Sequence, residues 1–206
     1  MTKNKEPHPK NERTLVIIKP DGIQRTLIGE IISRYERVGL KLIAIKMVVP
    51  TKAQAEKHYT LDPKWLMSVG QKNLDAYKEK GLKAPFDNAF DQGNAILQKL
   101  IKYLSSGPVI PMVWQGAHAV KIVRKITGGT EPLTTDVGTI RGDYVLDSYE
   151  ISDNYVRALR NLVHASGSVQ EAEDEIKHWF SDDEVVKYTH FQEKILYDVN
   201  LDGILE

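Results

Sequence analysis

The chain has 206 residues, enough for one domain with a sizeable core and room for insertions. Lys plus Arg and Asp plus Glu number 28 each, so a net charge of zero argues against a general nucleic-acid or membrane surface. The absence of cysteine excludes disulfides and thiolate catalysis and favours a reducing compartment, which we take to be the cytoplasm. No apolar run approaches the ~20 residues of a membrane helix, and the polar residues 1–12 predict a disordered tail rather than a signal peptide.

The first part of the chain predicts two strands with a helix between them. Residues 14–19, TLVIIK, form an unbroken apolar run that predicts a buried central strand, and the Pro-Asp-Gly after it predicts a turn. Residues 27–38 place their apolar side chains on one helical face, and residues 40–49 predict a second strand. Residues 51–59 begin with a pattern typical of a capping box and predict a short helix that ends at a tyrosine.

The pattern loosens over residues 60–94, which predict an insertion or a mobile functional segment. Within it we expect a helix over 73–80 and a loop over 81–91. Residues 109–114 predict a third strand. Because Pro111 cannot donate to a β-ladder, this strand is expected at an edge of the sheet or with a bulge at the proline.

The remaining segments predict a fourth strand and further helices. In chain order they are helices 96–104 and 117–126, loop 129–139, strand 142–147, a polar insertion 147–157, helices 169–180 and 182–188, and a C-terminal extension 189–206. This order predicts one α+β domain over 13–188, a ferredoxin-like split βαβ sandwich in which helices cover a four-stranded antiparallel sheet.

Residues 161–168, NLVHASGS, place a histidine directly before a helix N-terminus. Ser168 and Glu171 have the spacing of a capping box, and the free amides and dipole of such a helix end favour negative charge beside His164. Glu175 falls at the edge of the apolar stripe of that helix and is expected to point inward, toward the histidine. A histidine, a carboxylate and an anion-favouring helix end suit a histidine that attacks or carries phosphate.

Taken alone, each of these residues also has an ordinary structural interpretation. A strand-end lysine such as Lys19 or a helical arginine such as Arg124 is commonly just solvated. His178 lies opposite the apolar stripe and is expected to face solvent. None of the other histidines is expected to be catalytic: His8, His58, His118, His178 and His190.

Several motifs occur together and in order. They are Thr14-Leu-Val-Ile-Ile-Lys19-Pro-Asp-Gly22, Gly107-Pro-Val, Trp114-Gln-Gly116, Gly138-Thr-Ile-Arg141-Gly-Asp143, and Asn161-Leu-Val-His164 with Ser166 and Glu175. Together they resemble the nucleoside diphosphate kinases from about residue 12 to residue 188. Two extra segments, near 60–94 and 147–157, interrupt the resemblance.

The resemblance implies an enzyme that moves the γ-phosphate of a nucleoside triphosphate to a nucleoside diphosphate, and so maintains triphosphate pools. It implies a ping-pong mechanism through a phosphohistidine at His164, with Glu175, Ser166 and Tyr59 supporting the histidine. The implied nucleotide contacts are Lys19, Arg124, Thr130, Arg141 and Asn161. Arginine suits bidentate phosphate binding and lysine supplies a point charge.

The resemblance further implies substrates and assembly. The partners are ATP and other nucleoside tri- and diphosphates, with Mg²⁺ held mainly by the nucleotide phosphates rather than by protein ligands. A homo-oligomer is expected, through the outer helices and the loop after Gly129.

Replacing Arg141 with alanine is expected to weaken nucleotide binding and turnover without unfolding the protein.

The sequence departs from the family pattern at Gly167, where an acidic residue is usual. It also leaves the aromatic residue that stacks on the nucleotide base unassigned, with Trp65, Phe86 and Phe90 as candidates.

Two other functions compete with the kinase. An RNA-binding module is disfavoured by zero net charge and by the absence of an RNP-type aromatic run, and an inactive relative by the intact His164, Arg141 and Lys19.

Overall fold

The computed structural model describes residues 9–197. Residues 1–8, most of the predicted tail, and residues 198–206 of the predicted extension lie outside the described part. Inside the tail range, Pro9–Asn11 form one 3₁₀ turn. Within residues 9–197, no helix combines the length and the apolar character needed to span a bilayer.

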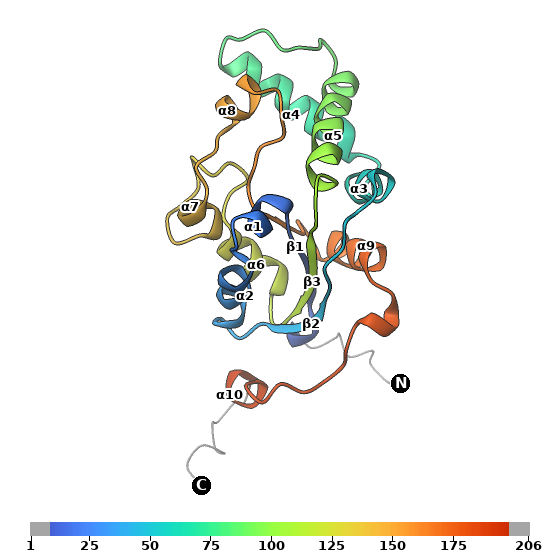
Figure 1. Cartoon of the computed structure of the whole chain (residues 1–206), viewed down its shortest axis with the longest axis vertical. Helices are drawn as coiled ribbons and strands as arrows, with labels where there is room; N and C mark the ends of the chain where they lie inside the picture. Colours follow the sequence, from blue (N-terminus) through green and yellow to red (C-terminus); the bar gives the residue numbers. More distant parts are fainter. Residues whose placement is uncertain (1–8, 198–206) are drawn as a thin grey trace, which may run out of the picture.

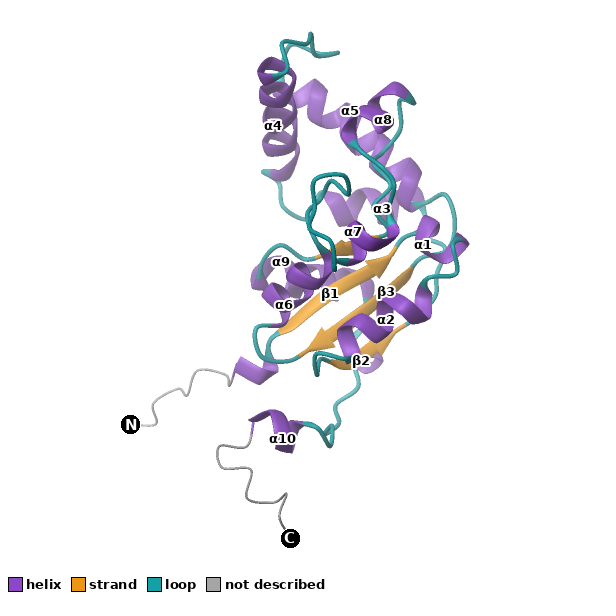
Figure 2. Ribbon diagram, turned by 90° about the vertical axis from the view of Figure 1, so that its left-hand side faces the viewer, coloured by secondary structure: helices purple, strands orange, loops and turns teal. Residues whose placement is uncertain are grey.

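Four antiparallel strands form one sheet in the order β2-β3-β1-β4 (Figure 2). The strands are β1 Arg13–Ile18, β2 Lys41–Ile45, β3 Ile110–Gln115 and β4 Val163–Ala165. This order and direction are those of the ferredoxin-like split βαβ sandwich, so the predicted fold class is confirmed.

Helices cover both faces of the sheet, which explains the unbroken apolar run of β1. Leu15 and Ile17 pack with α3 Lys52–Tyr59, α5 Ala89–Leu104 and α9 Val169–Trp179. Val16 and Ile18 point to the other face and pack with α2 Ile28–Glu36, α6 Ala119–Thr127 and α7 Ile140–Tyr144. Because successive side chains of a strand alternate between faces, a strand buried on both sides is apolar throughout.

The prediction that Pro111 places its strand at an edge, or in a bulge at the proline, is wrong. β3 lies inside the sheet, and the only register shift between β2 and β3 lies at Leu42–Ala44, opposite Val113 and Trp114. Lys46, directly after the end of β2, donates its N–H to the carbonyl of Pro111. The N and C=O of one residue point to the same neighbouring strand in an antiparallel ladder, so the missing N–H of Pro111 costs one hydrogen bond to the segment after β2. That segment pairs with the Pro111 strand again at Val48 and Val109.

The predicted strand 142–147 is also wrong, because α7 occupies its first half. Thr139 caps α7 by accepting a hydrogen bond from the amide of Gly142. Leu146 is fully exposed, so the Tyr-Val-Leu run has no continuous buried face. The fourth strand is instead β4, which has three residues and is too short to show a strand pattern.

The first insertion is a helical hairpin, where the sequence predicted only helix 73–80 and a loop 81–91. Helix α4 runs Trp65–Glu79, and α5 begins at Ala89, capped by Asn88 (Figure 1). The two helices approach very closely at Gly70 and Gly93. A Cβ at Gly70 would lie 1.8 Å from the carbonyl oxygen of Ala89, and one at Gly93 would lie 2.2 Å from that of Leu66. The two glycines therefore act as packing positions rather than as helix breakers.

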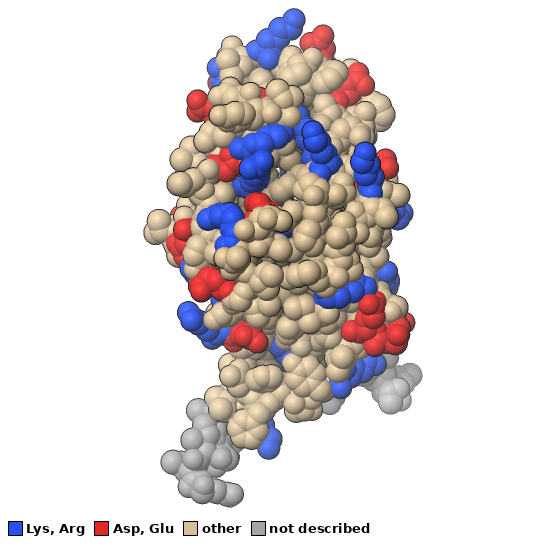
Figure 3. All heavy atoms as spheres, viewed as in Figure 1, with Lys and Arg blue, Asp and Glu red and all other residues tan. Residues whose placement is uncertain are grey.

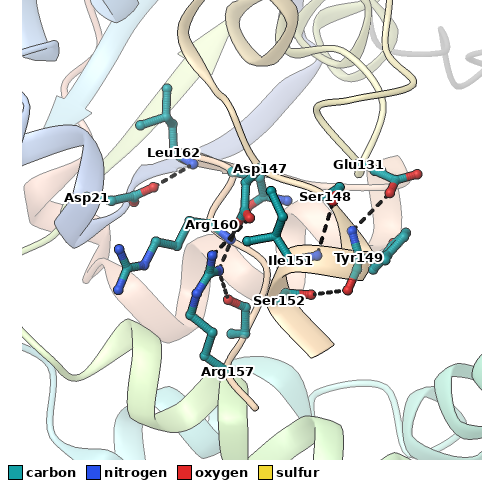
Figure 4. Close-up of polar contacts among 12 residues, drawn as sticks. Asp21, Glu131, Asp147, Ser148, Tyr149, Ile151, Ser152, Arg157, Arg160 and Leu162 are labelled. Carbon is teal, nitrogen blue, oxygen red and sulfur yellow. Dashed lines mark hydrogen bonds and ion pairs between the residues drawn. The ribbon is translucent and has the colours of Figure 1, made fainter. Parts of the chain in front are cut away.

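The second insertion is a loop that contains the short helix α8 Tyr149–Asn154 and is held by hydrogen bonds to Asp147. Asp147 accepts two hydrogen bonds from the guanidinium of Arg157, at 2.7 and 2.9 Å, and one from the amide of Arg160 at 2.8 Å (Figure 4). The hydroxyl of Tyr77 on α4 donates to Asp153 on α8 at 3.3 Å. The two insertions therefore meet above the sheet.

Three short elements complete the described chain. The predicted turn after β1 is a short helix, α1 Pro20–Gln24, and the predicted helix 182–188 is reduced to a 3₁₀ turn, Asp182–Glu184. The last helix, α10 Glu193–Tyr197, is tied to β2 by an ion pair of 2.7 Å between Lys41 and Glu193.

Candidate active site

His164 stands on the edge strand β4, where it pairs with Ile17 of β1. The chain reaches it through Leu162, whose backbone is left-handed, with φ of 62°. The amide of Leu162 donates to the carboxylate of Asp21 (Figure 4). The carbonyl of Leu162 accepts from the amide of Lys19. Non-glycine residues in this conformation are uncommon and cluster at functional sites, where the surrounding contacts maintain them.

Glu175 lies where the helical pattern placed it, facing the histidine from α9. Its carboxyl group is 3 % exposed, and its Oε1 lies 2.7 Å from Nε2 of His164. The pair does not meet the geometry of a regular hydrogen bond, as is common in enzymes without substrate. Its Oε2 accepts from the hydroxyl of Ser166 at 2.6 Å, and Ser166 accepts from the amide of Leu15.

The predicted capping box at the start of α9 is only half formed. Ser168 accepts from the amide of Glu171 at 3.1 Å, but the carboxylate of Glu171 turns to the amide of Gly167 at 3.0 Å. A Cβ at Gly167 would lie 2.6 Å from that carboxylate. An acidic side chain at Gly167 would therefore compete with Glu171 for the same space.

Lys19, Asn161 and Thr130 form one connected group on the cationic side of the site. The ammonium of Lys19 is 6 % exposed and donates to the amide oxygen of Asn161 at 2.7 Å. The amide nitrogen of Asn161 donates in turn to the carbonyl of Thr130 at 3.0 Å. The structure thus brings together three of the residues that the resemblance assigned to the nucleotide.

The two predicted arginine contacts differ sharply. Arg124 is exposed on α6. Arg141, on α7, is 8 % exposed, and its guanidinium donates to the carbonyls of four residues at 2.6–3.2 Å: Asn161, Gly128, Gly129 and Val163. These four contacts predict that replacing Arg141 with alanine lowers stability as well as nucleotide binding; that the variant still folds stays a prediction.

Burial and the cluster of cations favour neutral forms at this site. Burial, followed by the charge of Lys19, lowers the pKa of His164. Burial and the charge of Arg141 lower the pKa of Lys19 to about 7, and burial lowers that of Arg141 to about 10. Burial raises the pKa of Glu175, opposed by His58 and by the Ser166 hydrogen bond.

Sequence reasoning missed the part that His58 plays in this site. Its ring lies edge-on to that of His164, with centroids 4.5 Å apart, and Tyr59 packs against His58 at 4.9 Å. The available signal was the spacing of Ala55 and His58, which puts both on the buried face of α3. His178, expected in solvent, is half-buried with its Nε2 2.9 Å from the carbonyl of Gln54.

A cleft of about 430 Å³ opens onto His164 between α3 and α9. Its lining includes Tyr59, Trp65, Ser168 and Glu171. Trp65 is thus the one of the three candidate aromatics that lines this cleft. Phe86, in the loop between α4 and α5, and Phe90, in the first turn of α5, are exposed.

One group of side chains in the described residues has donor atoms close enough for a metal ion: His58, His164 and Glu175, within 4.8 Å of one another. The contact of Glu175 with His164 already accounts for the proximity of these atoms, so we assign no protein-bound metal there.

The fold and the site define a class of protein, an α+β sandwich in which a histidine on an edge strand faces buried cations. The family model for nucleoside diphosphate kinase matches residues 12–64 and 77–185. The chain therefore belongs to the nucleoside diphosphate kinase family, as the sequence motifs indicated. The unmatched residues 65–76 lie within α4 of the first insertion.

Individual relatives agree with this assignment. A nucleoside diphosphate kinase of Pyrobaculum aerophilum is 47% identical over 180 residues, which cover 85% of this chain and 98% of that protein. The solved structure of an NDP kinase from that organism has a TM-score of 0.82 at 45% identity, covering 86% of this chain and all of that one. A nucleoside-diphosphate kinase from Borrelia burgdorferi, solved as a transition-state mimic with vanadate and ADP, has a TM-score of 0.75 at 34% identity, covering 91% of this chain and 98% of that one.

Proposed function

We propose that this chain transfers the γ-phosphate of a nucleoside triphosphate to a nucleoside diphosphate by way of phosphorylated His164. The contact of Glu175 with Nε2 of His164 carries the proposal, because it leaves Nδ1 as the nitrogen that attacks. A bond forms between Nδ1 and the γ-phosphorus, and the bond from that phosphorus to the bridging oxygen breaks, so the diphosphate leaves with the electron pair. A second diphosphate then attacks the phosphohistidine and reverses these changes.

The charges around His164 support this chemistry. Burial and Lys19 lower the pKa of His164, so its ring is neutral and has a lone pair to donate at neutral pH. Transferred phosphoryl groups carry charge on their peripheral oxygens, so catalysis depends mostly on position and on nearby cations. Figure 3 shows Lys and Arg side chains around a hollow above α1, where α5 and the segment after α8 meet.

Within this proposal, Lys19, Arg124, Thr130, Arg141 and Asn161 hold the nucleotide, and Ser166 and Tyr59 support the histidine. The nucleotide enters as its Mg²⁺ complex, with the ion on the phosphates. We assign base stacking to Trp65, because it lines the cleft at His164. The domain is taken as residues 13–188, with insertions at about 60–94 and 147–157.

The proposal also includes a cytoplasmic location and a homo-oligomer. Exposed apolar side chains on and after the edge strand β2 support self-association: Ile45, Met47 and Val49. Light scattering on the purified protein tests the assembly, and cell fractionation tests the location.

The direct test of the activity uses γ-labelled ATP. Purified protein is mixed with labelled ATP and magnesium, quenched in base, and examined for acid-labile label before and after GDP is added. Uptake of label and its transfer to GDP are expected. If the wild-type protein takes up no label, the proposed function is wrong.

Nucleotide binding is expected to take up a proton above about pH 7. The pKa of Lys19 is about 7 in the free protein, and the negative phosphates of a bound nucleotide raise it. Between these two pKa values the free protein has a neutral lysine and the complex a charged one, so affinity for ADP falls as the pH rises through this window. Titration calorimetry at about pH 8, in two buffers of different ionisation enthalpy, measures the uptake.

The matched variants are Lys19→Met and Lys125→Met. The first is expected to abolish proton uptake. The second removes an exposed lysine from α6 and is expected to leave it unchanged. Equal uptake in wild type and in Lys19→Met would show that another group accepts the proton.

A further inference from the structure

His58 is buried at the centre of the site but has no role in the transfer chemistry described above. It sits on α3 with 4 % exposure, between the ring of His164 at 4.5 Å and that of Trp179 at 5.7 Å. Its Nδ1 lies 3.8 Å from Oε1 of Glu175. That same oxygen lies 2.7 Å from Nε2 of His164. The two histidines therefore face one carboxylate oxygen.

The indole of Trp179 decides which form of His58 is present. Its Nε1–H donates to Nδ1 of His58 at 3.2 Å. An indole nitrogen only donates, so Nδ1 must be the acceptor and the neutral ring must carry its proton on Nε2. The nitrogen of His58 that faces Glu175 is thus occupied by the hydrogen bond from the indole.

Without that indole hydrogen bond, His58 would compete for Glu175. With Nδ1 free, the neutral ring could carry its proton there instead of on Nε2, and could donate it to Oε1 of Glu175 across the present 3.8 Å. The carboxylate would then be drawn away from Nε2 of His164. A hydrogen bond to a buried carboxylate is strong, and Nε2 of His58 is buried without a hydrogen-bond partner among the described residues, so the competing tautomer would be well populated.

We propose that Trp179 and His58 form a positioning pair that reserves Glu175 for His164. The kinetic part of this inference rests on the proposed function. Neither residue is assigned a contact with the transferred phosphate. They act through Glu175, by preventing a second imidazole from sharing it.

The surroundings of His58 keep its ring neutral with or without the indole. Burial lowers the pKa of His58, and charge on His164, His178 and Lys19 acts in the same direction, opposed by Glu175. The competition for Glu175 therefore involves the two neutral tautomers of His58 rather than an imidazolium. Trp179→Phe removes the hydrogen bond to Nδ1 and frees this nitrogen to carry the proton and donate it to Glu175.

Trp179→Phe is the central test, since phenylalanine keeps an aromatic ring in the core and removes only the donor. Phosphohistidine formation from labelled ATP is timed over a range of ATP concentrations. In Trp179→Phe the maximal rate is expected to fall by about tenfold or more, because a displaced Glu175 no longer orients the attacking imidazole. The ATP concentration that gives half the maximal rate is expected to stay at the wild-type value, because neither residue of the pair is assigned a contact with the nucleotide.

Two further variants separate this effect from general damage. His58→Leu in the Trp179→Phe background removes the competing imidazole and is expected to restore the maximal rate. His178→Gln changes an imidazole that also packs on Trp179 and is expected to leave the maximal rate at wild type. A maximal rate of Trp179→Phe equal to that of wild type would overturn the proposal, as would a loss of rate that persists after His58 is removed.

The tautomer of His58 is tested without reference to activity. Nitrogen-15 NMR of the histidine rings in the full-length wild-type protein is expected to show His58 neutral, with its proton on Nε2. A proton on Nδ1 would overturn the proposal even if Trp179→Phe failed to fold. If the tautomer is as expected but wild type takes up no label from ATP, the pairing stands and the proposed function fails.

Discussion

Replacing His164 with asparagine is expected to reduce phosphate transfer by at least about 10⁴-fold, because the side chain that accepts the phosphate is removed. An amide nitrogen has no lone pair comparable to that of imidazole and does not form the phosphorylated intermediate. The assay is uptake of acid-labile label from γ-labelled ATP and its release to GDP. The fold is expected to persist, because Glu175 keeps its 2.6 Å hydrogen bond from Ser166 and β4 keeps its pairing with β1.

His118→Asn is the matched control for this variant. His118 is an exposed histidine at the N-terminus of α6, with a left-handed φ of 56°. Asparagine tolerates this conformation better than most residues, so the change is expected to preserve both the fold and the transfer rate. Label uptake by His164→Asn equal to that of wild type would place the nucleophile elsewhere.

The parts of the fold that followed from the sequence are those in which one interaction dominates. The run Leu15–Ile18 is buried on both faces, so hydrophobicity alone identifies the strand. The ends of α9 follow from local chemistry, since Ser168 caps its first turn and its apolar side chains recur at helical spacing. In such segments local preference and tertiary packing agree.

The mistaken predictions lie where the outcome depended on a distant segment. Pro111 is tolerated inside the sheet because it removes only one ladder hydrogen bond, between pairings at Met112 and Val109 that hold the strand on either side, which nothing near residue 111 indicates. Gly70 and Gly93 support a close helix pair, but each taken alone resembles a helix breaker. β4 is too short to show a period and exists as a strand because β1 pairs with it.

The site was predictable as a set of residues but not as an arrangement. The motifs identified His164 and Glu175, and the helical spacing oriented Glu175 correctly. The position of His58 could not be derived, because it depends on how α3 packs against α9 across the sheet face. The burial of Arg141 was missed for a similar reason, since its acceptors are backbone carbonyls from two separate segments, the loop after α6 and the chain at the start of β4.

Replacing Arg141 with alanine is expected to lower the free energy of unfolding by about 3–5 kcal/mol. The guanidinium donates four hydrogen bonds to carbonyls that join the loop after α6 to the segment before His164. Alanine would remove the guanidinium donor from two buried carbonyls, those of Asn161 and Val163, and from two partly exposed ones, those of Gly128 and Gly129, and each such loss costs about 1 kcal/mol. Denaturant unfolding of the protein without nucleotide measures the change.

Arg124→Ala separates the stabilising role from phosphate binding. Arg124 was predicted to contact the same nucleotide but is exposed, so its loss is expected to change stability by no more than about 0.5 kcal/mol while weakening ADP binding. Arg141→Ala is expected to lose both stability and binding, because the carbonyls it holds also position Asn161 and the chain that leads to His164. If both variants kept wild-type stability and lost only affinity for ADP, the carbonyl contacts of Arg141 would be dispensable and its role would be that of a phosphate ligand alone.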